Sequence, residues 1–169
     1  LIKNSLKLRL WLDLNFSVTA LDLNCMFAPT TNILLVDDMK GVRLLIAKAL
    51  KELGFSKISE AENGHEGFSI LKSSLATPQP IQLVISDLKM PKMDDLEFLR
   101  LTRANKETAG IPFIILTAES EKENVVRAIQ LGVSDYMIKP MTAPILSKKL
   151  EIVWDFHFGK NPKTINSAG

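Results

Sequence analysis

The sequence predicts an α/β fold in which a five-stranded parallel sheet is covered by helices on both faces. Short, almost continuously apolar runs, typical of buried strands, alternate along the chain with segments in which apolar residues recur at helical spacing. This alternation implies right-handed crossovers and parallel pairing. The apolar runs lack a polar face, so both sides of the sheet should be buried.

The strands and helices can be placed from these patterns. Five strands are expected, at residues 33–36, 57–61, 83–87, 113–117 and 135–138. The expected helices are residues 42–53, 64–74, a segment around Leu96 and Leu99, residues 121–131, and a last helix capped by Thr142 that runs to about Val153. Ser120 and Glu123 have the spacing of a capping box. The expected arrangement is the flavodoxin-like doubly wound sheet, with strand order 2-1-3-4-5.

Residues 42–53 illustrate how a helix is placed. Its apolar residues recur every three or four positions, and Gly54 follows the last of them. We expect these residues to form the buried face: Val42, Leu45, Ile46, Ala49, Leu50 and Leu53.

Composition limits the classes of function. With 169 residues, 46% of them apolar and 24% charged, the chain resembles one soluble domain with some excess at its ends. The single cysteine, Cys25, excludes a disulfide framework and fits a reducing compartment. A net charge of +2 does not indicate nucleic-acid binding, and no apolar run reaches the roughly 18 residues of a membrane span. We expect a cytoplasmic monomer.

The chain divides into three parts. Residues 1–30 are expected to be an N-terminal extension, residues 31–155 the domain, and residues 156–169 a C-terminal tail. From Leu6 to Val18 apolar and polar residues alternate, which is a strand pattern.

Two interpretations of the N-terminal extension remain open. We expect the natural start at Met26, with residues 1–25 as upstream read-through or a dispensable arm. The alternative is an extra edge strand or a partner-binding segment.

Near the C-terminal end, Trp154 and Phe158 are four residues apart and could share one helix face. This pair suits either packing or an added contact surface.

Polar residues follow four of the predicted strands. Asp37 and Asp38 follow the first, Asp87 ends the third, Thr117 ends the fourth and Lys139 follows the fifth. Each has an ordinary explanation as a cap or a turn residue. Since the carboxyl ends of parallel strands meet at one edge, however, all of them should lie together.

These residue types suit phosphoryl chemistry. Three crowded carboxylates repel one another and become tolerable around a hard divalent cation such as Mg²⁺. A carboxylate can act as a nucleophile and form an acyl phosphate. The Lys139 ammonium and the Thr117 hydroxyl can contact the oxygens of the transferred group. The sequence therefore predicts a phosphoryl-acceptor site.

Four stretches carry a resemblance to a known family. The chain resembles response-regulator receiver domains over residues 31–155, and within them the stand-alone chemotaxis regulators of the CheY type. The stretches are Leu34–Asp38, Ser86–Asp94, Leu116–Glu119 and Tyr136–Pro140. The run Thr117–Asn124 favours the chemotaxis subgroup.

The resemblance implies roles for the site residues. Asp87 would be the phospho-acceptor, and Asp37, Asp38 and Asp87 would bind Mg²⁺ together with the backbone carbonyl of Lys89. Lys139 would pair with the phosphoryl group. A histidine kinase would be the donor. The domain would not be an enzyme in its own right, although it would assist its own phosphorylation and dephosphorylation.

The resemblance also implies a switch. Thr117 would move towards the phosphoryl group while Tyr136 turns inward, and the Lys139–Pro140 peptide bond would be cis. These movements would remodel the face made by the fourth helix, the fifth strand and the fifth helix, where a target protein, the flagellar motor switch, would bind.

Some residues depart from the family pattern. Asp95 stands where the family usually has glycine, and Met141 replaces a common phenylalanine. Lys89 and Glu119 flank the site, and we expect them to tune the lifetime of the phosphoryl group.

Three other functions use similar residues or a similar fold. One is a stand-alone receiver in another phosphorelay. A second is a Mg²⁺-dependent aspartyl phosphatase, but Lys89 occupies the position where that chemistry usually places a second acid. The third is a flavin- or nucleotide-binding protein, which would need a phosphate-binding loop where Asp37 and Asp38 stand.

Overall fold

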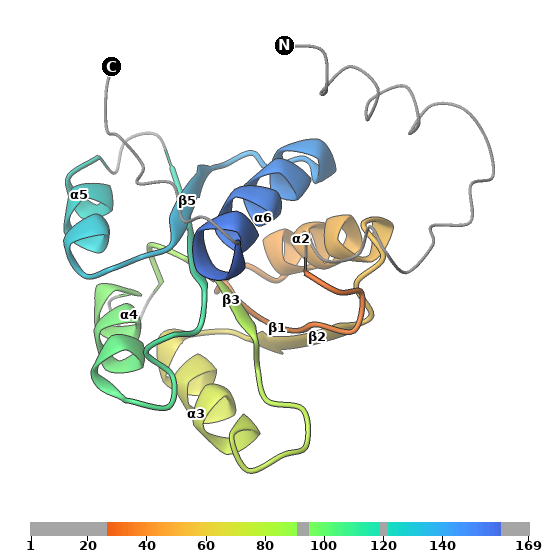
Figure 1. The fold of residues 1–169 in the computed structure, drawn as a ribbon. Helices are drawn as coiled ribbons and strands as arrows, with labels where there is room; N and C mark the ends of the chain where they lie inside the picture. The colour runs from red at the N-terminus through yellow and green to blue at the C-terminus, as the bar shows by residue number, and fades with distance from the viewer. Residues whose placement is uncertain (1–26, 91–94, 119–121, 160–169) are drawn as a thin grey trace.

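The computed structural model describes residues 27–90, 95–118 and 122–159. Its strands form one parallel sheet in the order β2-β1-β3-β4-β5, which confirms the predicted fold (Figure 1). The strands are β1 (Asn32–Val36), β2 (Lys57–Ala61), β3 (Leu83–Asp87), β4 (Phe113–Thr117) and β5 (Asp135–Ile138).

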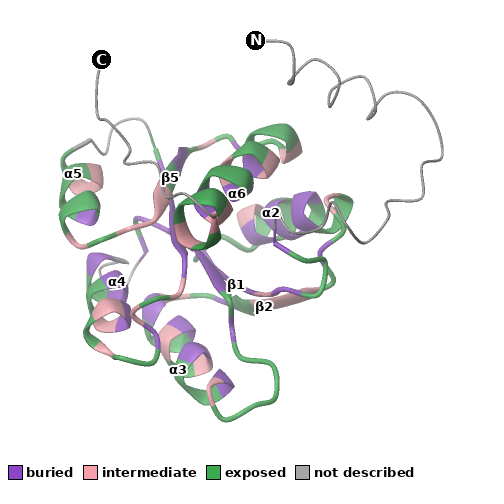
Figure 2. Ribbon diagram, in the orientation of Figure 1, coloured by how far each residue is buried: buried purple, intermediate pink, exposed green. Residues whose placement is uncertain are grey.

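Helices cover both faces of this sheet. They are α2 (Lys40–Glu52), α3 (Gly64–Ser74), α4 (Asp95–Ala104), α5 (Lys122–Gln130) and α6 (Ala143–Phe158). Buried residues of α2 and α6 form one apolar cluster with the sheet, and buried residues of α3, α4 and α5 form another on the opposite face. Figure 2 shows the buried residues along the strands and the inner sides of the helices.

Alternating side chains of each strand enter the two clusters. Ile33 and Leu35 of β1 join the cluster of α2 and α6, whereas Leu34 and Val36 join the other. All four are fully buried. Burying an aliphatic side chain of this size contributes about 1.5–3 kcal/mol. This burial on both faces explains why the central strands β1, β3 and β4 appear in the sequence as largely apolar runs.

The predicted buried face of α2 is wrong at one position. Leu45 is 54% exposed, while Arg43 is buried. Periodicity assigns a charged residue to the solvent side, but Arg43 is surrounded by backbone and carboxylate oxygens that accept its hydrogen bonds.

The cap of α6 differs from the expectation, and α3 has a side-chain cap that was not predicted. Thr142 occupies the N-cap position of α6 but forms no side-chain cap bond. Pro144, in the first turn, lacks an N–H to donate to it. In α3 the cap is Asn63, whose side chain accepts from the Glu66 backbone N–H, and the Glu66 side chain accepts from the backbone N–H of Glu62.

The ends of the folded unit extend beyond residues 31–155. Helix α6 continues to Phe158, and Phe27 is buried in the cluster of α2 and α6. The predicted alternating segment from Leu6 to Val18, the start at Met26, the Ser120 cap and Glu119 lie outside the described residues. Within the described ranges, no helix is both long and apolar enough to cross a membrane.

Candidate functional site at the carboxyl edge of the sheet

Strand register brings the predicted polar residues to one edge. Val36 pairs with Ser86, Asp87 with Leu116, and Thr117 with Ile138, so the four strands end at the same level. The backbone N–H of Lys139 donates to the carbonyl of Thr117 at 2.8 Å and joins the last two strand ends. Asp37 and Lys139 each follow directly after a strand.

Three carboxylates converge at this edge. Asp37, Asp38 and Asp87 each contribute one oxygen, and these oxygens lie within 4.8 Å of one another. Asp37 and Asp87 are buried whereas Asp38 is exposed, so the cluster is anchored in the sheet and open on one side. A set of carboxylate oxygens with room for water fits Mg²⁺, which retains water ligands when bound to protein.

A shallow pocket lies over the carboxylates. Lys89 is exposed in the wall of this pocket, and two methionines also line the pocket. The lining residues are Asp38, Met39, Asp87, Lys89, Met90, Ala118 and Lys139.

Lys139 bridges two of the acids. Its Nζ lies 2.9 Å from Asp37 Oδ2 and 2.7 Å from Asp87 Oδ1. Burial alone would lower the pKa of Lys139, but the hydrogen bonds and charges of Asp37 and Asp87 outweigh it and raise the pKa above its ordinary value. Lys139 is therefore a fixed cation directly beside the Asp87 carboxylate.

Asp87 itself is held in an unfavourable charge state. Burial raises the pKa of its carboxyl group above the ordinary value; Lys139 opposes this rise and the Asp37 charge adds to it. A cation bound among the three acids would lower the free energy of the ionised Asp87 carboxylate, because it would offset both the lost hydration and the repulsion from Asp37.

The conformation of Asp37 is set by four hydrogen bonds. Its Oδ1 accepts from the Met39 backbone N–H at 2.8 Å, and its Oδ2 accepts from Lys139. Its own N–H donates to the carbonyl of Ala61 at 3.2 Å, and its carbonyl accepts from Arg43 Nη1 at 2.7 Å. The turn that carries Asp37 and Asp38 is thus ordered before any ligand binds.

Arg43 is the site residue that the sequence reasoning missed. Besides the Asp37 carbonyl, its guanidinium binds Glu62 Oε1 at 2.9 Å and Glu60 Oε2 at 3.4 Å. It therefore ties the acidic turn to the end of β2. The available signal was its position, since Arg43, Ile46 and Leu50 share the buried face of one helix.

The two predicted switch residues differ in burial. Thr117 is buried, and its hydroxyl donates to the carbonyl of Ala118 at 3.0 Å. Tyr136 lies on the edge strand β5 and is 36% exposed. The Lys139–Pro140 bond is cis, as the resemblance implies, and Met141 is buried in the cluster of α2 and α6.

The chain matches the family model of the response regulator receiver domain over residues 33–151. It is 42% identical over 127 residues to the probable chemotaxis protein CheY of Rhizobium etli, covering 75% of this chain and 95% of that one. It is 33% identical over 123 residues to chemotaxis protein CheY-3 of Vibrio cholerae, covering 73% and 91%.

Solved structures share the fold. A response regulator receiver domain protein from Clostridium thermocellum has a TM-score of 0.66 at 30% identity, over 74% of this chain and 94% of that chain. The chemotaxis response regulator CheY4 of Vibrio cholerae has a TM-score of 0.63 at 26% identity, over 73% and 98%.

Proposed function

The chain belongs to the response-regulator receiver family, the phospho-acceptor modules of two-component signalling, and from this premise we propose that Asp87 accepts a phosphoryl group from a histidine kinase. The observation that supports this most strongly is the position of Asp87. It is in contact with the Lys139 ammonium and shares a cluster with two further carboxylates.

The transfer itself needs little covalent chemistry from the protein. One Asp87 carboxylate oxygen attacks phosphorus as the phosphorus–nitrogen bond of the donor phosphohistidine breaks, leaving an acyl phosphate and a free imidazole. Lys139 lies where its ammonium can pair with a phosphoryl oxygen, which compensates for the ion pair that Asp87 gives up.

Mg²⁺ would be held by Asp37, Asp38 and Asp87, and the carbonyl of Lys89 would be a further ligand. The ion supplies positive charge that offsets the negative charge of the carboxylates and the transferred group. The hydrogen bonds that fix Asp37 keep its carboxylate in place for this role.

The output would be a protein contact on the face of α5, β5 and α6, with Thr117 and Tyr136 as the switch. Apolar side chains are exposed on these three elements, which suits a protein partner. They include Ile129, Tyr136, Ile138, Ile152 and Phe156.

The names of the similar proteins support a role in chemotaxis. We propose the flagellar motor switch as the target and the cytoplasm as the location. A stand-alone receiver of another phosphorelay would use the same site and face, so binding to the target distinguishes the two roles. We propose that the chain acts as a monomer.

The chemistry can be tested by intact mass. The chain is incubated with acetyl phosphate, with Mg²⁺ or with EDTA, alongside Asp87→Asn and the exposed control Asp155→Asn. We expect one phosphoryl adduct that requires Mg²⁺, persists in D155N and is lost in D87N. Failure of the folded wild-type chain to form an adduct would contradict the proposal.

A further inference from the structure

A lysine of helix α6 lies against the Tyr136 ring. The Nζ of Lys149 is 5.4 Å from the ring centroid of Tyr136, which is within the range of a cation–π contact. Tyr136 belongs to the edge strand β5, so this contact links the strand to the helix beside it. The ring is partly exposed in this arrangement.

Asp135 fixes the lysine in this position. Lys149 Nζ lies 2.9 Å from Asp135 Oδ1 and 2.9 Å from Oδ2. The two side chains are 29% and 14% exposed, so water screens this ion pair less than a fully exposed one. Asp135 Oδ1 also accepts from the Tyr136 backbone N–H at 2.7 Å. One carboxylate therefore orients both the tyrosine backbone and the cation over its ring.

We propose that Asp135 and Lys149 are positioning residues that hold Tyr136 in its outward orientation and so oppose activation of the unphosphorylated chain. This inference rests on the proposed function, in which Tyr136 turns inward on phosphorylation. The ring would leave the ammonium as it turns, whereas the Asp135–Lys149 ion pair could persist. The outward state thus has an attractive contact that the inward state lacks.

The size of the bias follows from the type of contact. A cation–π contact at a partly exposed site shifts a two-state equilibrium by about two- to fivefold. Such a bias lowers the population of the inward state before phosphorylation. It does not prevent the transition, because the phosphoryl group has only to favour the inward state by more than this free energy.

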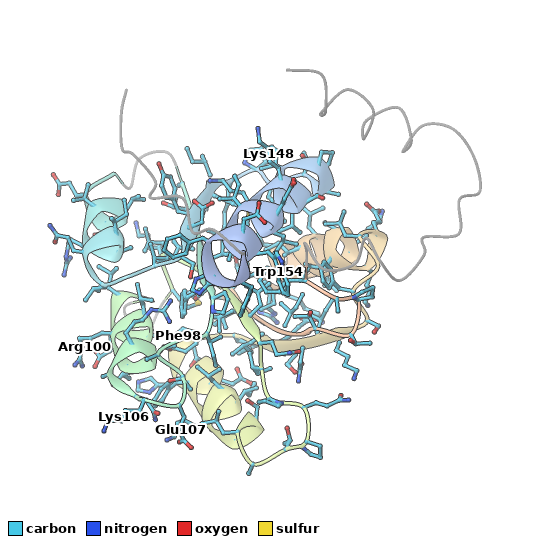
Figure 3. The ribbon with its side chains drawn as sticks, viewed as in Figure 1. Phe98, Arg100, Lys106, Glu107, Lys148 and Trp154 are labelled. Atoms are coloured by element: carbon cyan, nitrogen blue, oxygen red, sulfur yellow. The ribbon has the colours of Figure 1, made fainter. Side chains whose placement is uncertain are left out.

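The orientation of Tyr136 can be followed with a single spectroscopic probe. Tyr136 is its single tyrosine, so 3-fluorotyrosine labelling places one fluorine probe on the switch residue. The matched control is Lys148, the exposed neighbour on the outer side of α6, which forms no ion pair within the described residues (Figure 3). Substituting it makes the same change of charge one residue away.

The experiment compares fluorine spectra of the full chain before and after incubation with acetyl phosphate and Mg²⁺, with the adduct followed by mass. In the unphosphorylated state we expect Lys149→Gln and Asp135→Asn to move the resonance towards the phosphorylated position, with a two- to fivefold larger inward-to-outward ratio. Lys148→Gln should match the wild type, and Lys149→Arg should preserve the outward signal.

Two results would overturn the inference. The fluorine resonance of K149Q could coincide with that of K148Q, or it could move away from the phosphorylated position. In either case a normal adduct on the wild-type chain would leave the proposed function intact. Failure of the proposed function would instead appear as a missing adduct, and the inference would fall with it. A general loss of stability in K149Q would add a separate resonance at the position of the unfolded chain and would not move the folded resonance along the phosphorylation axis.

Discussion

The ion pair with Lys139 compensates only part of the cost of burying Asp87. The pKa of Asp87 is raised, so folding disfavours the ionised carboxylate relative to the unfolded chain, although the proposed chemistry needs that ionised form. A carboxylate buried beside a second acid costs stability, and strongly perturbed groups of this kind are concentrated at functional sites. Such positions are where function and stability oppose each other.

Asp87→Asn should therefore stabilise the metal-free chain. The raised folded pKa means that the Asp87 contribution to stability is present below the ordinary pKa of 3.8 and is lost as the pH rises through the folded value. At pH 7 the substitution removes an unfavourable charge, and we expect a gain of about 0.5–2 kcal/mol in urea unfolding with EDTA.

Added Mg²⁺ should then stabilise the wild-type chain more than D87N, because the variant lacks one carboxylate ligand. A D87N chain that is less stable than the wild type in EDTA would show that the Lys139 ion pair outweighs the burial.

Helix α6 shows how an element can extend a domain. Trp154 and Phe158 share one face, as their spacing predicts, with ring centroids 4.6 Å apart. Phe27 packs edge-on against both, at 5.2 Å and 6.1 Å. Packing explains these two C-terminal aromatics, and it ties the chain before β1 to the end of the last helix.

Phe27→Ala should destabilise the fold markedly. The ring is buried, and replacing a buried phenylalanine by alanine typically costs about 3–5 kcal/mol. Urea unfolding followed by tryptophan fluorescence measures the change. The control Phe156→Ala removes a ring that is 45% exposed and should stay within about 1 kcal/mol of the wild type. Equal effects of the two variants would contradict the packing described here.

Helix α2 is also tied to other segments of the fold. Its Arg43 connects the helix to the acidic turn and to β2. Arg43→Met should weaken Mg²⁺ binding about 10- to 100-fold although no ligand is removed, because loss of a group that orients metal ligands typically has that effect. Calorimetric titration with MgCl₂ measures it. Arg100→Met, which removes an exposed arginine paired with Glu97, should leave the affinity unchanged. Unchanged affinity in R43M would mean that the turn is ordered without the arginine.

At the scale of the whole molecule, the sequence predicts the sheet and its edge well because the central strands have a clear pattern. Burial on both faces makes β1, β3 and β4 largely apolar, and the parallel topology places Asp37, Asp87 and Lys139 together. The cis peptide before Pro140 was predicted by resemblance alone.

Other features could not be predicted, because they depend on contacts between elements distant in sequence. The burial of Arg43 was not predicted, because periodicity gives no reason to bury a charge, and its partners Glu60 and Glu62 come from β2 and the loop after it. The contact of Lys149 with Tyr136 likewise depends on how α6 lies beside β5. Helical and strand patterns carry no information on such pairs.

The molecule also separates its site from its proposed output. The acids lie at the carboxyl edge of the sheet, whereas Tyr136 lies on β5 beside α6. Strand β5 connects the two, because Lys139 follows its last residue directly. A shift of Lys139 towards a phosphoryl group would therefore act on the strand that carries Tyr136.

The most direct test of the central claim is to identify the carboxylate that carries the phosphoryl group. The chain is phosphorylated with acetyl phosphate and Mg²⁺, treated with borohydride, which reduces an acyl phosphate to the alcohol, and sequenced by tandem mass spectrometry. We predict homoserine at position 87 and unmodified aspartate at Asp37 and Asp38. Homoserine at position 37 or 38, or an intact adduct that yields no homoserine, would contradict the assignment of Asp87 as the acceptor.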